Sequence, residues 1–280
     1  MRSSFRFPAR PAGGNYGYYS TSTVLAVLFL LPMIWTLYSS VHGKKADDGG
    51  NGWGFANYSR LLDYGSGLGT YVLNTALVTL VTVAVTVFAT TLGGYAVARL
   101  SFPGKNVLFL LTLAILMVPY TTILIPLYIV LGWLSLQNSL FGLGLVLAMF
   151  QLPFGLFMMR NSFEALPIEL EEAALIDGCT PGSALRRVLL RGVAPGMVTV
   201  ALFSFLASWN EFIAPLIFLT DGDKYTLPVA LFNLQAGNLG SVDFGALQAG
   251  VVTAAVPCVA VFLLLQRYYV QGFSAGALKG

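Results

Sequence analysis

Residues 166–195 read LPIELEEAALIDGCTPGSALRRVLLRGVAP, the most charged stretch of a chain that otherwise consists mainly of apolar runs. Pro167 suits the first position of a helix, acidic residues follow in the first turns, and Gly178 can adopt the left-handed conformation that ends a helix. Thr180 can then cap a second helix that begins at Pro181. The stretch therefore predicts two short helices that meet at a glycine.

The first of these helices has a face that another protein's backbone can approach closely. Four residues fall there at helical spacing: Leu170, Ala173, Ala174 and Asp177. Two helices around a glycine, followed by Arg186 and Arg187, also fit a helix-turn-helix that enters a DNA groove. The apolar runs on both sides disfavour a nucleic-acid partner, and a solvated connecting loop is the third interpretation.

The composition indicates an integral membrane protein. Hydrophobic residues make up 56% of the chain, charged residues make up 10%, and the mean hydropathy is +0.76. Soluble domains average about 45–50% apolar and about 25% charged residues. Cys179 and Cys258 lie far apart in the sequence, so their spacing suggests neither a metal site nor a disulfide framework.

Six apolar runs are long enough to cross about 30 Å of hydrocarbon. They cover residues 23–41, 71–98, 107–131, 139–159, 193–219 and 246–268. No convincing small-x-small cleavage site follows the first run, so we expect it to be retained as a span. The sequence predicts an all-α membrane protein with a tail at 1–22, a six-span domain at 23–271 and a tail at 272–280. The charged loop covers 163–192, and a second polar loop covers 220–245.

Lys and Arg residues predict the orientation of the spans. With the N-terminus inside, the inner segments hold eleven of them and the outer segments hold four. We therefore expect both termini and the charged loop to lie in the cytoplasm of a cell carrying this chain in its inner or plasma membrane. The loop at 220–245 then lies outside.

Several kinds of chemistry are missing from the sequence. The glycines before Lys44 and Lys105 lack a second glycine five positions earlier, so no Walker pattern for ATP exists. Residues 272–276 spell a nucleophile elbow around Ser274, but the single histidine, His42, is predicted on the other side of the membrane. No metal-ligand cluster is apparent. The chain is expected to be non-catalytic.

The charged stretch resembles the cytoplasmic coupling loop of permease subunits in binding-protein-dependent ABC importers. The matching residues are Glu172, Ala173, Ala174, Asp177 and Gly178. The resemblance implies the type I importer permease fold, with six transmembrane helices and a coupling helix that docks on an ATPase through these residues and Glu171. The family usually has Leu-Pro about a dozen residues after the glycine, whereas here Leu190 is followed by Arg191.

The outer loop and the C-terminal segment are similar to those of the maltose-type second permease, which serves carbohydrate uptake. The loop resemblance begins at Asp-Lys-Tyr-Thr-Leu-Pro, residues 223–228. It implies contact with an extracytoplasmic binding protein through Asp223, Lys224, Tyr225, Asn233 and Gln235. The resemblance of residues 266–280 implies contact with the ATPase pair. Without the resemblance, residues 220–245 read as an unstructured connector.

Threonines recur along one face of the second predicted span, at Thr75, Thr79, Thr82, Thr86 and Thr90. Threonines of this kind commonly mark close packing of helices in lipid. Thr79 and Thr82 are alternatively candidates for the lining of a translocation path. Gln151, beside Pro153, is a further candidate. The prolines in spans three to six, among them Pro119 and Pro126, indicate either packing kinks or bends beside a cavity.

Glu211 is the unusual residue of the fifth predicted span. An acidic side chain at the bilayer centre costs about 2.5–3.5 kcal/mol on insertion scales, so it should face the bundle interior or water. It follows Ser204, Ser208 and Asn210 on the same run. An inter-subunit hydrogen bond and a place in the translocation path both fit, and proton coupling in a secondary transporter is the alternative function.

These observations predict a permease subunit of an ATP-driven sugar importer. The expected partners are a second permease subunit, two ATPase subunits that hold ATP and Mg²⁺, an extracytoplasmic sugar-binding protein and the lipid bilayer. No cofactor is expected in this chain. Another small solute, such as a glycerol phosphate, is the alternative substrate.

Overall fold

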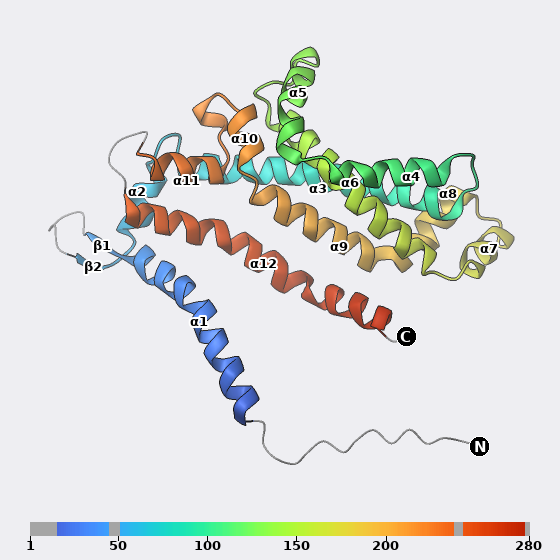
Figure 1. The fold of residues 1–280 in the computed structure, drawn as a ribbon, viewed down its shortest axis with the longest axis horizontal. Coiled ribbons are helices and arrows are strands. Elements are labelled where there is room, and N and C mark those ends of the chain that lie inside the picture. Colours follow the sequence, from blue (N-terminus) through green and yellow to red (C-terminus); the bar gives the residue numbers. More distant parts are fainter. Residues whose placement is uncertain (1–15, 45–50, 238–242, 278–280) are drawn as a thin grey trace.

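The computed structural model describes residues 16–44, 51–237 and 243–277, which form an elongated set of helices with one small β-ribbon. The predicted tails at 1–22 and 272–280 and the loop at 220–245 thus lie partly outside the described residues. The ribbon pairs β1 (His42–Lys44) with β2 (Asn51–Trp53) in antiparallel register. It lies with α2 (Ala56–Leu62) at one end of the molecule, and α7 (Glu169–Ile176) and α8 (Pro181–Ala184) lie at the other (Figure 1).

Three long helices, α3 (Leu68–Arg99), α6 (Leu140–Glu164) and α9 (Leu190–Trp209), form the centre of the fold. The threonine face of α3 packs against α6, where Thr82 Oγ1 donates to the Gly144 carbonyl at 3.1 Å. A Cβ at Gly144 would come within 2.7 Å of Val81, and one at Gly155 within 2.7 Å of Thr90. Glycines on one helix and threonines on the other therefore bring α3 and α6 unusually close.

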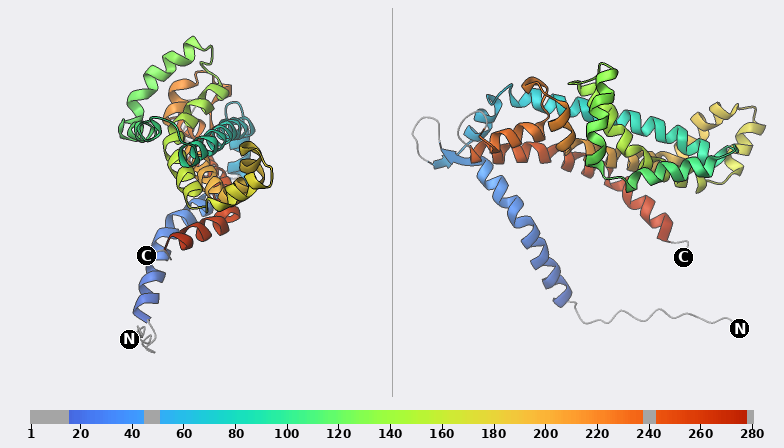
Figure 2. Two further views of the ribbon diagram at one scale, coloured as in Figure 1. Left: turned by 90° about the vertical axis from the view of Figure 1, so that its right-hand side faces the viewer. Right: turned by 45° about the horizontal axis from the view of Figure 1, so that its top comes forward.

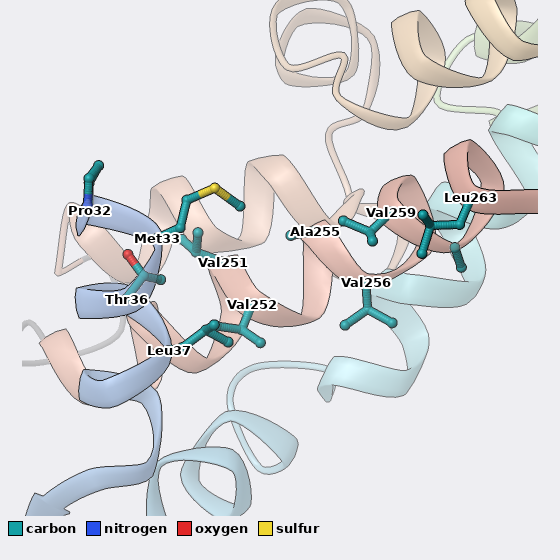
Figure 3. A pocket seen from close by; sticks show the side chains of 11 residues that line it. Pro32, Met33, Thr36, Leu37, Val251, Val252, Ala255, Val256, Val259 and Leu263 are labelled. Carbon is teal, nitrogen blue, oxygen red and sulfur yellow. The ribbon is translucent and has the colours of Figure 1, made fainter. Parts of the chain in front are cut away.

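The first helix, α1 (Tyr16–Val41), diverges from the rest of the molecule toward its N-terminal end (Figure 2). It leaves a groove of about 560 Å³ against α12 (Phe244–Ala277), lined by apolar side chains such as Met33, Leu37 and Val256 (Figure 3). Helix α12 continues to Ala277, beyond the expected end of the last span at 268. Most side chains of α1 are exposed, as expected for a helix that meets lipid or another subunit.

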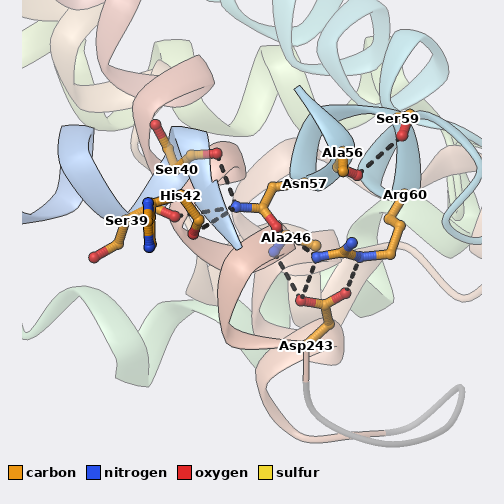
Figure 4. Close-up of polar contacts among 9 residues, drawn as sticks. All are labelled: Ser39, Ser40, His42, Ala56, Asn57, Ser59, Arg60, Asp243 and Ala246. Carbon is orange, nitrogen blue, oxygen red and sulfur yellow. Dashed lines mark hydrogen bonds and ion pairs between the residues drawn. The ribbon is translucent and has the colours of Figure 1, made fainter. Parts of the chain in front are cut away.

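A polar junction joins the ends of α1, α2 and α12 (Figure 4). The buried Asn57 amide donates to the carbonyls of Ser39 at 3.0 Å and Ser40 at 2.9 Å. Arg60 pairs with Asp243 at 2.5 Å and also donates to the Asn57 side-chain oxygen. The Asp243 carboxylate accepts the Ala246 N–H at 3.0 Å, which caps the start of α12.

The prediction of one continuous span at 107–131 is wrong, because the helix is broken and bent there. The structure has α4 (Lys105–Ala114), the 3₁₀ turn η1 (Ile115–Met117) and α5 (Tyr120–Trp133), with a bend of 107° between the two parts. Val118 is extended, because a residue before proline is driven away from helical angles and Pro119 follows it. The described residues contain five helices long and apolar enough to cross a membrane, or six when this bent pair counts as one span.

The expected fifth span at 193–219 is also interrupted. Helix α9 ends at Trp209, and a separate helix, α10 (Ile213–Phe218), follows after Asn210. At its other end α9 continues directly from a π-helical turn, η2 (Leu185–Leu189), which links it to α8. The chain from Pro181 to Trp209 is therefore a continuous helical rod that contains one wide turn.

The loop at 220–245 contains ordered structure, so its interpretation as an unstructured connector is wrong for the described part. The 3₁₀ turn η3 (Gly222–Lys224) leads into α11 (Leu227–Gln235). The buried Thr75 hydroxyl of α3 accepts the Leu227 N–H at 2.8 Å. Residues 238–242 lie outside the described part of the chain.

Candidate coupling site and outer loop

Helix α7 ends in the glycine turn that the sequence predicts. Gly178 has a φ of +85°, and its N–H donates to the Leu175 carbonyl at 3.0 Å. The Cys179 N–H reaches back to the Ala174 carbonyl at 3.0 Å, which completes the Schellman arrangement of a helix C-terminus. Thr180 then caps α8 by accepting the Ser183 N–H at 3.4 Å. The predicted pair of short helices around a glycine is confirmed.

The outward face of α7 mixes acidic and apolar side chains. Glu172, Ala173 and Asp177 are exposed, as the coupling prediction requires. Ile176 is 86% exposed beside them. Ala174 is only 5% exposed and faces the body of the protein, so its expected place on the docking face is wrong. A helix this short has one side against its neighbours, and Ala174 falls on that side.

Glu171 points away from the outward face and is held by two residues of α3. Its carboxylate accepts the Tyr95 hydroxyl at 2.7 Å and lies 3.6 Å from Arg99 Nε, with only 13% of the Glu171 side chain and 9% of the Arg99 side chain exposed. The Arg99 guanidinium also donates to the carbonyls of Phe163 at 2.9 Å and Leu166 at 2.7 Å. Glu171 is therefore placed to fix α7 on α3, and direct contact with a partner is an unsuitable role for it.

The motif does not single out Tyr95 and Arg99, which lie on α3 far from it in the sequence. The sequence does contain a signal for this ion pair: Arg99 is the last residue of α3, and an acidic helix follows the α6 span. A basic residue at a helix C-terminus is favoured by the helix dipole, and it needs an anionic partner if it is buried.

The path candidates at the end of α9 form side-chain hydrogen bonds with carbonyls of their own helix. Ser204 and Ser208 are buried, and the Ser208 hydroxyl donates to the Ser204 carbonyl at 2.7 Å. Asn210 is exposed, and its amide donates to the Leu206 carbonyl at 2.8 Å. These contacts leave the role of the three residues in a translocation path as a prediction.

Glu211 joins the two interrupted spans. Its Oε1 accepts the Tyr120 hydroxyl at 2.8 Å from the start of α5. The same oxygen accepts the N–H groups of Ile213 at 2.9 Å and Ala214 at 3.1 Å, which begin α10. The carboxylate therefore satisfies the free donors of a helix start and connects it to the break beside Pro119.

The remaining path candidates occupy different surroundings. Thr82 is fully buried in the contact between α3 and α6, and its hydroxyl donates to two carbonyls there. Thr79 lines an apolar groove of about 320 Å³ with Phe205 and Trp209. Its hydroxyl has no hydrogen-bond partner among the described residues. Gln151 is half-buried on α6.

The predicted binding-protein contacts lie on η3, at its end and on α11, and α11 lies toward the opposite end of the molecule from α7 (Figure 1). Asn74 of α3 holds the loop by donating to the carbonyls of Asp223 at 2.8 Å and Tyr225 at 3.0 Å. Lys224 pairs with Asp221 at 3.0 Å, and this contact, with a hydrogen bond from Asn138, lowers the pKa of Asp221. The other predicted contacts lie on α11, where Asn233 is half-buried and Gln235 is exposed. Asp223 is exposed, and the structure brings Tyr225 and Asn233 around one cavity.

Among the described residues, no group of three or more His, Cys, Asp or Glu side chains could hold a metal ion. The two cysteines, Cys179 and Cys258, are both free. The described residues thus place an exposed acidic helix, α7, at one end of the molecule and a loop held by Asn74 at the other.

Known proteins are similar to this chain in sequence, and a solved structure is similar to it in fold. A profile of the family described as binding-protein-dependent transport system inner membrane component matches residues 89–274. The chain is 32% identical to the diacetylchitobiose uptake system permease protein NgcG of Streptomyces coelicolor, over 91% of this chain and 85% of the relative. It is 31% identical to the trehalose transport system permease protein SugB of Mycobacterium tuberculosis, over 94% of this chain and 97% of the relative.

A solved structure confirms the architecture. It belongs to a bacterial ABC transporter involved in the import of the acidic polysaccharide alginate, and its chain matches with a TM-score of 0.78 and 22% identity. The match covers 94% of this chain and 100% of the other. The fold is thus that of a type I importer permease. Since the family profile covers more than half of the sequence, the chain belongs to the binding-protein-dependent transport system inner membrane components, the non-catalytic permease subunits of ABC transporters.

Proposed function

We propose that this chain is one of two permease subunits of an ATP-driven sugar importer and forms half of its translocation path. The observation that carries the proposal is the exposed face of α7, where Glu172, Asp177 and Ile176 stand at the end of the molecule farthest from the outer loop. The names of the relatives supply the substrate class, since those proteins serve uptake of diacetylchitobiose and trehalose.

In this proposal α7 lies in the cytoplasm and docks on an ATPase dimer that binds ATP and Mg²⁺. ATP binding closes the dimer and moves α7, and Glu171 carries that motion to α3 through Tyr95 and Arg99. The chain itself contributes two conformations of different stability and makes no bonds. An extracytoplasmic binding protein delivers the sugar at the end that holds η3 and α11.

Ion coupling is the less suitable alternative. It would depend on Glu211 exchanging a proton or ion, but one Glu211 oxygen already accepts three hydrogen bonds that hold α5 and α10 in place. Glu211 therefore has a structural role. Because this leaves ion coupling without a suitable carboxylate, it supports ATP as the source of energy.

Uptake of labelled trehalose and diacetylchitobiose by cells expressing variants tests the proposal. We expect Glu172→Lys to abolish uptake because it reverses a charge on the docking face. Gly178→Val should also abolish it, because a β-branched residue is strained at a φ of +85°.

Two matched variants at the opposite end, Asp63→Lys and Gly54→Val, serve as controls. Asp63 is exposed, and a Cβ at Gly54 would meet nothing within 4 Å. Normal uptake in both α7 variants, at equal membrane abundance, would contradict the coupling role. Uptake that survives loss of the ATPase and stops when the ion gradient collapses would contradict ATP drive.

A further inference from the structure

The loop between α2 and α3, the start of α3, η3 and α11 enclose a cavity of about 370 Å³. Two of the elements beside it, α2 and α11, lie toward the end of the molecule opposite to α7 (Figure 1). Three tyrosines from three different segments line it: Tyr64, Tyr71 and Tyr225. The lining also includes Ser66, Gly222 and Asn233. This lining differs from that of the groove between α1 and α12, which is almost entirely apolar.

The tyrosine hydroxyls supply unused hydrogen-bonding capacity. The Tyr64 hydroxyl is buried, and no described residue hydrogen-bonds to it. Burial, with a smaller contribution from Tyr71, raises the pKa of Tyr64, so the group stays a neutral donor. The Tyr71 hydroxyl accepts the Ser66 N–H at 2.9 Å, which leaves its own proton for another acceptor. A buried hydroxyl without a partner costs free energy that a polar ligand would recover.

The walls of the cavity are held in place before any ligand arrives. Asn74 fixes the carbonyls of Asp223 and Tyr225, and Thr75 fixes the N–H of Leu227 at 2.8 Å. Both anchors lie on α3, the most extensively packed helix of the fold. A site built in this way loses little conformational entropy on binding.

We propose that this cavity is a saccharide subsite at the outer end of the permease, which receives a sugar ring as the binding protein releases it. The inference rests on the proposed function and adds a site to it. Aromatic rings offer flat apolar faces to the C–H side of a sugar, while tyrosine hydroxyls offer partners to its hydroxyls. The volume lies within the range of small-molecule pockets, about 300–1,000 Å³. None of the residues that line the cavity carries a charged side chain, so a neutral sugar is the expected ligand.

Two substitutions address the cavity, each with a matched control outside it. Tyr64→Phe removes the unpartnered hydroxyl, and Tyr128→Phe makes the same change on α5, where the ring stacks on Phe218. Gly222→Leu adds bulk at the cavity wall, because a Cβ there meets only the Tyr225 ring at 4.0 Å. Gly54→Leu makes the same change where no atom lies within 4 Å.

The measurement is saturation-transfer difference NMR on the assembled transporter in nanodiscs, without its binding protein. The probes are trehalose, N,N′-diacetylchitobiose, maltose and any sugar that the complete transporter imports. We expect at least one probe to bind, Tyr64→Phe to weaken its binding about three- to tenfold, and Gly222→Leu to abolish it. Both control variants should bind like the wild type.

Absence of a signal from every probe, or equal signals from all four variants, overturns the subsite. If the complete transporter imports a sugar in that case, the proposed function stands and the subsite alone is wrong. If the transporter imports no sugar, the proposed function fails, and direct binding of the probes still decides the question of the cavity. Melting temperatures of the variants, measured in detergent, establish that each protein is folded.

Discussion

Two neighbouring acids of α7, Glu171 and Glu172, have opposite surroundings. Glu172 is exposed on the outward face, whereas Glu171 is largely buried against Tyr95 and Arg99. The family motif begins at Glu172, so sequence reasoning treated the two residues as parts of one docking surface. On a helix, adjacent residues point about 100° apart, and only the packing against α3 decides which of them faces inward.

Arg99→Leu is expected to destabilise the protein strongly. It would leave the Glu171 carboxylate without its cation and remove the guanidinium donor from the carbonyls of Phe163 and Leu166, at a cost of roughly 3 kcal/mol. The melting temperature measured in detergent should fall by several degrees. Lys224→Leu breaks a surface pair of which both side chains are well exposed, and it should change the melting temperature much less than Arg99→Leu does. Equal losses of stability in the two variants would show that the buried Arg99 contact stabilises the fold no more than a surface ion pair does.

Asp243 gives the polar junction of Figure 4 a dependence on pH. Burial raises the pKa of Asp243, but hydrogen bonds from Arg60 and from the Ala246 N–H outweigh this and leave the pKa lowered. A lowered folded-state pKa means that the ion pair stabilises the fold fully above the unfolded value of about 3.9, and that this stability is lost as pH falls through the folded value.

We therefore expect Asp243→Asn to lower the melting temperature at about pH 6 and to have much less effect at about pH 3. Because both side chains of the pair are about a third exposed, the loss near neutral pH should be about 1 kcal/mol. Asp63→Asn, at the end of α2, is the control and should show no such trend. A difference that stays constant over this pH range would assign the effect to something other than the ion pair.

At the scale of helices, the contact between α3 and α6 depends on small residues. Gly144 lies directly against Val81, and the buried Thr82 hydroxyl donates to the Gly144 carbonyl. The spacing of the threonines correctly placed them on one face, and the structure assigns that face to packing. A path role for Thr79, whose hydroxyl is unpartnered among the described residues, remains a prediction.

Gly144→Ala should separate α3 from α6 and lower stability by about 1–3 kcal/mol, since the added carbon would lie 2.7 Å from a Val81 methyl group. Gly69→Ala is the matched control, because nothing lies within 4 Å of that position and alanine favours helix. Thermal unfolding in detergent should give opposite signs for the two variants. A stable Gly144→Ala protein would mean that the helices do not pack as closely as described.

The sequence predicted the apolar runs well and their interruptions poorly. Composition and run length identify the helices, because lipid requires every backbone group to be satisfied within its own segment. Proline does not identify the breaks: Pro153 and Pro257 lie inside continuous helices, while Pro119 lies at the break between η1 and α5. The break at residues 210–212 contains no proline and is stabilised by the tertiary contact between Glu211 and Tyr120. Such long-range partners cannot be read from local patterns.

At the scale of the whole molecule, the two regions with a proposed function lie at opposite ends of an elongated bundle (Figure 1). One end carries α7, and the other carries the β-ribbon, α2 and α11. The distribution of Lys and Arg predicts that α7 is cytoplasmic, and the separation of the two ends makes that orientation testable with one reagent.

We expect a membrane-impermeant maleimide to label Gly54→Cys in intact cells and Ile176→Cys only in inverted vesicles. Both positions are exposed, and the variants are made after replacing Cys179 and Cys258 with serine. The chain is expressed without its ATPase so that no partner shields Ile176. Labelling of Ile176→Cys from outside the cell would reverse the proposed orientation and remove the basis for ATPase docking.

The π-helical turn at Leu185–Leu189 has a consequence for how this chain tolerates change. A π turn is an α-helix that carries one surplus residue, and each residue of a helix accounts for about 100° of rotation. Deleting one residue there would remove the surplus and let the rod become regular helix, so the segments on either side of the turn would largely keep their directions. The same deletion in the α-helical part of the rod would turn α8, and with it α7, by about 100° around the axis of α9. The loss of a single codon is therefore better tolerated at the wide turn than along the regular helix.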